Sequence, residues 1–246
     1  MGGLARRASV LNTWRDTQQA FTVAGAYELN RPGNRAQKSS VTTFHRTFGH
    51  LGYDLGVLTG GEAAQLKTVL SGPEADNPIP PGWMQFSDQA QTKIFTHHGL
   101  RLGFIILPHT PGPQGQNTSG NGQMPGLEEA IRSLKSSCDL SIGLSPWGWQ
   151  KEKEFLESGS PVPDILLGSG SGPAILGKLA NNAHTVWLRP YSQGRALNAI
   201  SIPDPQAKDW VNGWRIEKNI HLEFLVLDDR VPSDPDIQEL LTSGSR

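Results

Sequence analysis

The sequence predicts an α/β fold in its first two-thirds and a mostly β-structured remainder. From residue 127 to residue 167, segments with helical spacing alternate with short apolar segments, an order typical of parallel strands joined by crossover helices. Residues 102–107 are nearly all apolar, as expected of a central strand that is buried on both faces. Later in the chain, three further apolar segments predict strands over 184–190, 197–203 and 219–227.

The first ninety residues predict helices and strands in alternation. Apolar residues return every three or four positions, as Leu4, Ala8 and Leu11 do, and this spacing is that of one helix face. Gly52 ends the second such segment. On this basis we expect helices over 2–19, 34–52 and 60–72, strands over 20–25 and 53–59, and a proline-rich connection over 72–91.

A β-hairpin is predicted over residues 92–108, with its turn at His98-Gly99. Residues 108–124 follow as a long Gly/Pro-rich loop, which we expect to be mobile on the surface or ordered by a partner. Beyond the loop, we expect helices over 127–137 and 150–158, strands over 139–144 and 164–167, and a closing helix over 234–244 that Ser233 or Asp234 caps.

The composition limits the class of function. The 246 residues suit a single domain over 1–246, and their net charge of −1 provides no basic field for nucleic acid. No apolar run reaches the roughly 20 residues of a membrane-spanning helix, and no signal peptide is visible at the start. The lone Cys138 excludes an internal disulfide and is expected to be a buried, unreactive thiol.

The glycine-rich run GSGSG at 168–172 follows a predicted strand, yet it lacks the residues of known catalytic loops. No G-x-S-x-G frames a nucleophile, and the Lys-Ser/Thr of a phosphate-binding loop is absent. No cofactor is predicted, because the chain has no Cys-x-x-Cys-His for a c-type haem and its histidines are scattered. We expect them to be ordinary surface or hydrogen-bonded side chains: His45, His50, His97, His98, His109, His184 and His221.

Four blocks of the chain resemble, in order, successive blocks of the calcineurin-like metallophosphoesterases, and most of all their 5′-nucleotidase-like branch. The blocks are GGLARRASVLNTWR, LGYDLGVLTGGEAAQL, CDLSIGLSPWGWQKEKEFLES and VPDILLGSGSGPA. The closing segment over 209–241 is also similar to that branch. The resemblance implies a two-layer β-sandwich flanked by helices, of αββα architecture. It also implies that the family's first strand, whose block would precede Met1, is lacking.

The resemblance further implies that the family's metal ligands are lost. In the family, two metal ions held by Asp, Asn and His activate a water against a phosphate ester. The corresponding positions of this chain carry residues without a donor side chain: Ala26, Gly60, Gly61, Pro146, Gly170 and Gly172. Glu62 survives, and we expect it to be a helix N-terminal residue. The resemblance therefore predicts a pseudoenzyme that binds no metal.

The first function that fits is a structural or docking subunit of a larger assembly. Trp147 and Trp149 are candidate partner anchors, because indoles are frequent at interfaces, although they could instead fill the vacated pocket. The family includes forms found beside multihaem cytochromes. The resemblance therefore implies a partner of that kind and a periplasmic or cell-surface location.

Two alternatives remain open. The chain could bind an anion or a nucleotide through the backbone of its glycine-rich turn, with Arg189 or Arg195 assisting. The turn residues are Gly168, Ser169, Gly170, Ser171 and Gly172. The second alternative is residual phosphoesterase hydrolysis, with His109 or His184 as the base.

Overall fold

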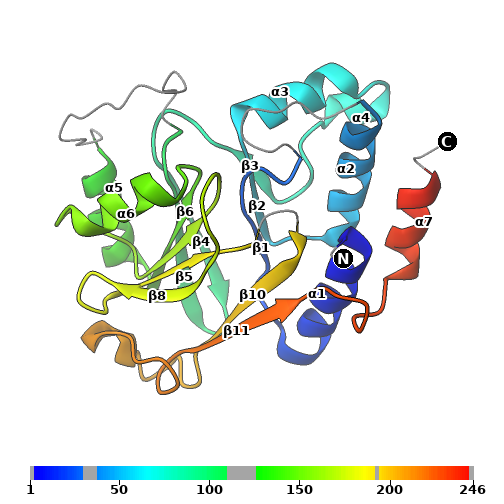
Figure 1. Cartoon of the computed structure of the whole chain (residues 1–246). Helices are drawn as coiled ribbons and strands as arrows, with labels where there is room; N and C mark the ends of the chain where they lie inside the picture. Colours follow the sequence, from blue (N-terminus) through cyan, green and yellow to red (C-terminus); the bar gives the residue numbers. More distant parts are fainter. Residues whose placement is uncertain (1–2, 30–37, 110–125, 192–193, 244–246) are drawn as a thin grey trace. The chain divides into compact units, whose positions relative to one another are not determined.

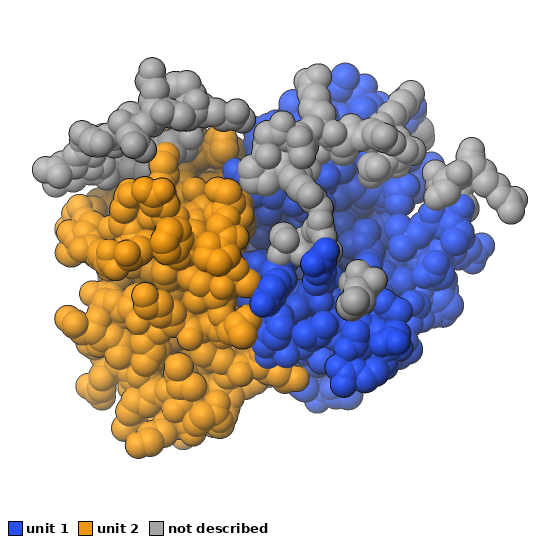
Figure 2. Space-filling view, in the orientation of Figure 1, with its two compact units in different colours: residues 1–85, 190–198, 224–246 blue, residues 86–189, 199–223 orange. Residues whose placement is uncertain are grey.

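A computed structural model describes residues 3–29, 38–109, 126–191 and 194–243 (Figure 1). The chain forms two compact units, coloured separately in Figure 2. Unit 1 contains residues 1–85, 190–198 and 224–246, and unit 2 contains residues 86–189 and 199–223. Each unit has its own sheet and its own helices. The predicted α/β class, with sheets flanked by helices, is therefore confirmed.

Unit 1 contains a three-stranded parallel sheet of order β1-β2-β3. Its strands are β1 (Val23–Ala24), β2 (Leu55–Leu58) and β3 (Trp83–Gln85). Its helices are α1 (Leu4–Gln18), α2 (Lys38–Leu51), α3 (Gly60–Val69), α4 (Pro73–Asp76) and α7 (Pro235–Ser243). All the helices and strands expected here are present in the described residues; residues 2, 34–37 and 244 of the expected helices lie outside them.

The strand β3 corrects the prediction of a plain connection over 72–91. It is only three residues long and follows four prolines, so no alternating pattern reveals it. Its pairing with β2 depends on Gly56, because a Cβ there would lie 2.2 Å from the indole of Trp83. Glycine at this position lets the indole lie flat against the neighbouring strand.

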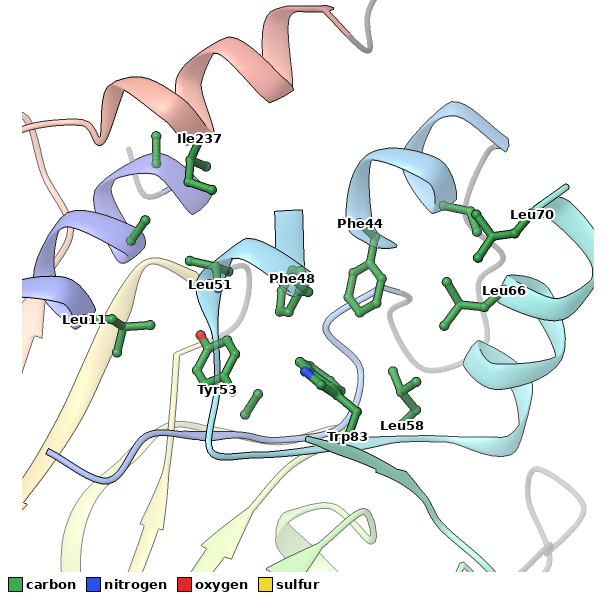
Figure 3. Close-up of a cluster of buried hydrophobic side chains, with 14 residues drawn as sticks. Leu11, Phe44, Phe48, Leu51, Tyr53, Leu58, Leu66, Leu70, Trp83 and Ile237 are labelled. Atoms are coloured by element: carbon green, nitrogen blue, oxygen red, sulfur yellow. The ribbon is translucent and has the colours of Figure 1, made fainter. Parts of the chain in front are cut away.

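The core of unit 1 is an aromatic cluster between α2 and the sheet (Figure 3). The rings of Phe44 and Phe48 stack with centroids 4.2 Å apart, and Trp83 meets Phe48 edge-on at 5.3 Å. Tyr53 completes the group at 5.9 Å from Trp83. Ile237 brings α7 onto the same core. Burial of these large rings holds α2 and α7 in place.

Two helix ends in unit 1 follow the sequence expectations. Gly52 takes a left-handed φ of +59° after α2, and Arg15 donates hydrogen bonds to the last carbonyls, those of Leu51 and Gly52. At the start of α7, the Asp234 carboxylate accepts the backbone N–H of Ile237 at 3.0 Å. Asp234 is therefore the cap, of the two residues that the sequence allowed.

Unit 2 contains a six-stranded mixed sheet of order β4-β5-β6-β7-β9-β8. Its strands are β4 (Gln91–His97), β5 (Leu100–Ile106), β6 (Leu140–Ser145), β7 (Ile165–Gly168), β8 (Ile175–Ala180) and β9 (Thr185–Arg189). Its helices are α5 (Leu127–Ser137), α6 (Trp149–Glu157) and the short 3-10 helix η2 (Asp209–Asn212). A two-stranded ribbon of β10 (Ala196–Ser201) and β11 (His221–Val226) has residues in both units.

The hairpin and the central strand of unit 2 are confirmed. His97 pairs with Leu100 across the two-residue turn, in which His98 and Gly99 both have positive φ. β5 lies between β4 and β6 and is buried along most of its length. The edge strand β8 was not expected, because Gly177 and Lys178 interrupt its apolar pattern. It becomes a strand by pairing antiparallel with β9.

Three smaller expectations concern other parts of the chain. Cys138 is half-buried, and burial raises the pKa of its thiol, as expected of an unreactive cysteine. The predicted loop over 108–124 lies, from residue 110 onward, outside the described residues. No helix in the described ranges is long and apolar enough to cross a membrane.

Candidate functional site

In unit 1, three of the positions that resemble metal ligands follow the carboxyl ends of β1 and β2. Ala26 is 8% exposed in the loop after β1. Gly60 and Gly61 are the first two residues of α3. A Cβ on Gly60 would lie 3.6 Å from the side-chain nitrogen of Gln85, and one on Gly61 would lie 3.9 Å from the hydroxyl of Thr59. These are ordinary contact distances, so a Cβ at either glycine would fit without a clash.

Glu62 has become a structural carboxylate. It forms a capping box with Thr59, whose backbone N–H and hydroxyl both donate to it at 2.9 Å. The backbone N–H groups of Leu29 and Tyr27 also donate to it, at 2.9 and 3.3 Å. Its side chain is fully buried. Glu62 thus ties the loop after β1 to the start of α3, as expected of a helix N-terminal residue.

In unit 2, the remaining positions lie on two loops that pack backbone against backbone. Pro146 is in the loop after β6, and Gly170 and Gly172 are in the turn after β7. A Cβ on Gly172, whose φ is +123°, would lie 2.3 Å from the Cβ of Trp149. One on Gly148 would lie 2.9 Å from the Ser171 carbonyl oxygen, which accepts the N–H of Trp149 at 2.9 Å. Glycine is therefore required here by close approach.

A buried ion pair fixes the turn after β7. Arg189, at the end of β9, donates to the carbonyls of Gly170, Ser171 and Pro173 at 3.1, 3.0 and 3.2 Å. Its Nη1 also donates to Glu152 of α6 at 2.5 Å. The two side chains are 3% and 0% exposed. The guanidinium thus acts as a fixed cation for the carbonyls of the turn, and Glu152 balances its charge.

The Glu152 carboxylate also leaves no space for a side chain at Gly168 and orients a tryptophan. Oε2 of Glu152 accepts the indole N–H of Trp187 at 2.9 Å. A Cβ on Gly168 would lie 2.1 Å from that oxygen, so only glycine fits beside it. The contacts of Gly168, Gly172 and Arg189 join β7, β9 and α6 into one rigid arrangement around the turn.

The sequence held a signal for this pair that its interpretation as a ligand site missed. Arg189 ends a strand predicted to be apolar, and a charged side chain in such a strand needs a buried partner. Glu152 and Leu156, at positions i and i+4 of α6, share the buried face of the helix. A charge on the buried stripe of each element indicates a pair.

The two candidate anchor tryptophans differ in their surroundings. Trp147 is half-buried, donates its indole N–H to the Pro108 carbonyl at 2.7 Å, and meets the Phe155 ring edge-on at 5.4 Å. Trp149 is 38% exposed, and the ammonium of Lys153 lies 5.9 Å from its ring centroid. Trp147 is thus used in packing within unit 2, whereas Trp149 presents its indole to solvent.

The residues suggested for an anion site do not converge on an open cradle. The N–H of Ser169 donates to Ser145, and the carbonyls of the turn point to Arg189. Arg189 is buried and paired, so its charge is not offered to a ligand. Arg195 belongs to unit 1 and is exposed.

The positions that resemble metal ligands do not fit a two-metal centre in either unit. None has a donor side chain, and at Gly172 a side chain would collide with Trp149. Within the described ranges, no group of three or more His, Cys, Asp or Glu is arranged to hold a metal ion. We therefore derive no hydrolytic step at these positions.

Comparison with known proteins finds similarity at the level of structure only. No family model matches the chain, and no curated protein sequence matches it. The solved structure of the NAD nucleotidase NadN of Haemophilus influenzae is 12% identical, with a TM-score of 0.54 over 99% of this chain and 56% of that one. The 5′-nucleotidase of Candida albicans is 11% identical, with a TM-score of 0.60 over 98% and 52%. A phosphatase from Mycoplasma pneumoniae is 13% identical, with a TM-score of 0.50 over 97% and 92%.

The chain therefore has a metallophosphoesterase-like fold. Within that class it has the 5′-nucleotidase-like form, which the resemblance of its sequence blocks predicted. It spans 56% and 52% of the two nucleotidases. At identities of 11–13%, this likeness concerns the fold alone.

Proposed function

We propose that this chain is a non-catalytic protein of metallophosphoesterase-like fold that serves as a docking subunit of a larger assembly. The observation that carries the proposal is the packing of Gly172 against Trp149. At a position that resembles a metal ligand, the space that a ligand side chain would need is filled by α6. The buried pair of Glu152 and Arg189 fixes this turn further. These contacts leave no space at Gly172 for a metal-ligating side chain and hold the turn as a rigid surface.

Trp149 supports the docking role. It stands at the first residue of α6, and it is among the large apolar side chains that remain exposed. Its indole lies beside a lysine on a helix whose other face is held by buried contacts. A rigid aromatic side chain of this kind is typical of an interface anchor. The partner class to test first is a multihaem cytochrome in the periplasm or at the cell surface, as the sequence resemblance implies.

The test is the native mass of the protein when it is drawn gently from its own cells. We expect a mass far above 26.7 kDa, with defined polypeptides bound. Trp149→Ala should release them, whereas the matched control Lys151→Ala, two residues along the same helix, should retain them. A monomer in the extract would contradict the docking role.

Two assays separate the alternatives. Release of phosphate from AMP in the presence of Mn²⁺, lost on chelation, would overturn the non-catalytic assignment and support a residual phosphoesterase. Saturable binding of inorganic phosphate or AMP to the isolated protein, abolished by changes at 168–172, would support the anion-binding alternative.

A further inference from the structure

A pocket of about 280 Å³ lies within unit 2, between the second half of α6 and the β8–β9 hairpin. Its lining contains no residue of the loop after β6 or of the turn after β7, so it is distinct from the positions described above. The apolar part of the lining includes Leu156, Ala180 and Trp187. Leu156 and Trp187 are 7% and 2% exposed, and the indole of Trp187 is fixed by its hydrogen bond to Glu152. The floor is thus apolar and rigid.

One cation on the rim has no counter-charge. Lys178 pairs with Trp187 across the β8–β9 ladder, which places both side chains on the same face of the sheet. Nowhere in the described ranges does the Lys178 side chain have an ion pair or a hydrogen bond. Lys153 differs, because its ammonium lies 4.0 Å from a carboxylate oxygen of Glu157, which is also on the rim. The pocket therefore carries one unbalanced positive charge.

The turn between β8 and β9 contributes two side-chain amides to the pocket lining, and its backbone conformation is fixed by other contacts. Asn181, Asn182 and Ala183 have φ values of 48°, 52° and 65°, three left-handed residues in succession. This conformation is costly for alanine, on the order of 1–2 kcal/mol. The N–H of Trp214 donates to the Ala183 carbonyl at 2.7 Å and holds the turn. A strained turn that its surroundings fix is typical of a functional segment.

We propose that this pocket binds a small organic acid, namely a carboxylate attached to an apolar body of about ten non-hydrogen atoms, because the volume falls just below the usual range for drug-sized ligands. The ammonium of Lys178 and the amide groups of Asn181 and Asn182 bind the carboxylate. The apolar body covers Leu156 and Trp187. This inference does not rest on the docking role.

The test is a titration of the full chain with phenylacetate, followed by amide and indole NMR shifts. We expect shifts at Trp187 and at 178–183, with a dissociation constant on the order of 1 mM, as suits so small a ligand. Lys178→Gln should raise this constant about tenfold, because a charge-assisted contact is lost. Lys178→Arg should retain binding, and Lys151→Gln on the same unit is the matched control.

Three further probes separate the parts of the proposal. Phenethylamine has the same ring with the opposite charge, and benzyl alcohol has no charge, so both should bind more weakly. Inorganic phosphate has charge without an apolar body and should not shift Trp187. Binding of phenylacetate unchanged in Lys178→Gln, equal binding of phenethylamine, equal shifts with phosphate, or no shift at about 20 mM phenylacetate would each overturn the proposal.

Discussion

Replacing Arg189 with methionine should destabilise unit 2 strongly. The change keeps most of the side-chain volume but removes the donors that serve Glu152 and the carbonyls of Gly170, Ser171 and Pro173. Glu152, whose side chain is fully buried, would lose its counter-charge. Removing one partner of a buried ion pair costs about 3–5 kcal/mol of unfolding free energy. For a chain of this size, that corresponds to a fall of about 10 °C in the melting temperature.

Urea unfolding, followed by circular dichroism and tryptophan fluorescence, measures the loss. The double variant Glu152→Gln with Arg189→Met removes both charges, so it should recover part of the loss, with a coupling energy of at least about 1 kcal/mol. Lys151→Met, at an exposed position of the same helix, is the control and should change stability by less than about 0.5 kcal/mol. A loss of unfolding free energy below about 1 kcal/mol in Arg189→Met would refute the reasoning, because the buried guanidinium would then contribute little to the stability of the turn.

Three further predictions test other contacts. Gly172→Ala should lower the free energy of unfolding by at least about 2 kcal/mol, because its Cβ would overlap that of Trp149 at a φ of +123°. Gly61→Ala should be neutral or stabilising by up to about 1 kcal/mol. Equal effects of the two changes in urea unfolding would contradict this contrast. Trp147→Ala should cost about 2 kcal/mol through lost packing on Phe155, and a smaller loss than in Trp149→Ala would show that the two roles are exchanged. Hydrogen bonds from Lys208 and from the Arg101 N–H lower the pKa of Asp139. The protein should therefore be more stable than the Asp139→Asn variant above a pH of about 4, and this difference should fade as the pH falls below that value. A stability difference that is independent of pH would contradict this prediction.

The elements that could be predicted are those whose pattern is local. The hairpin follows from His98-Gly99 between two apolar runs. α5 has the predicted bounds because its apolar face and the residues that begin and end it all lie within one short stretch of sequence. The strands β3 and β8 could not be predicted in this way. β3 has only three residues and follows prolines, Gly177 and Lys178 interrupt the apolar pattern of β8, and each strand forms by pairing with a neighbour. Their formation depends on topology, which a local pattern does not contain.

The contacts around the turn after β7 could not be predicted from the sequence. In one alternative of the sequence analysis, Arg189 assists the binding of an anion at the turn over 168–172. In the structure that arginine does reach the turn, but its guanidinium is paired with the carboxylate of Glu152, 37 residues earlier in the chain. A pairing between two elements that the sheet order brings together lies beyond what spacing alone can indicate.

The glycines at the positions that resemble metal ligands differ between the two units in what surrounds them. At Gly60 and Gly61 a Cβ would meet only ordinary contacts, so alanine could stand there without a clash. At Gly172 it could not, because Trp149 fills the space, and Gly168 is likewise held to glycine by Glu152. A donor side chain at Gly172 would require α6 to change together with the turn. This close packing supports the proposed non-catalytic role more directly than the lack of donor side chains does.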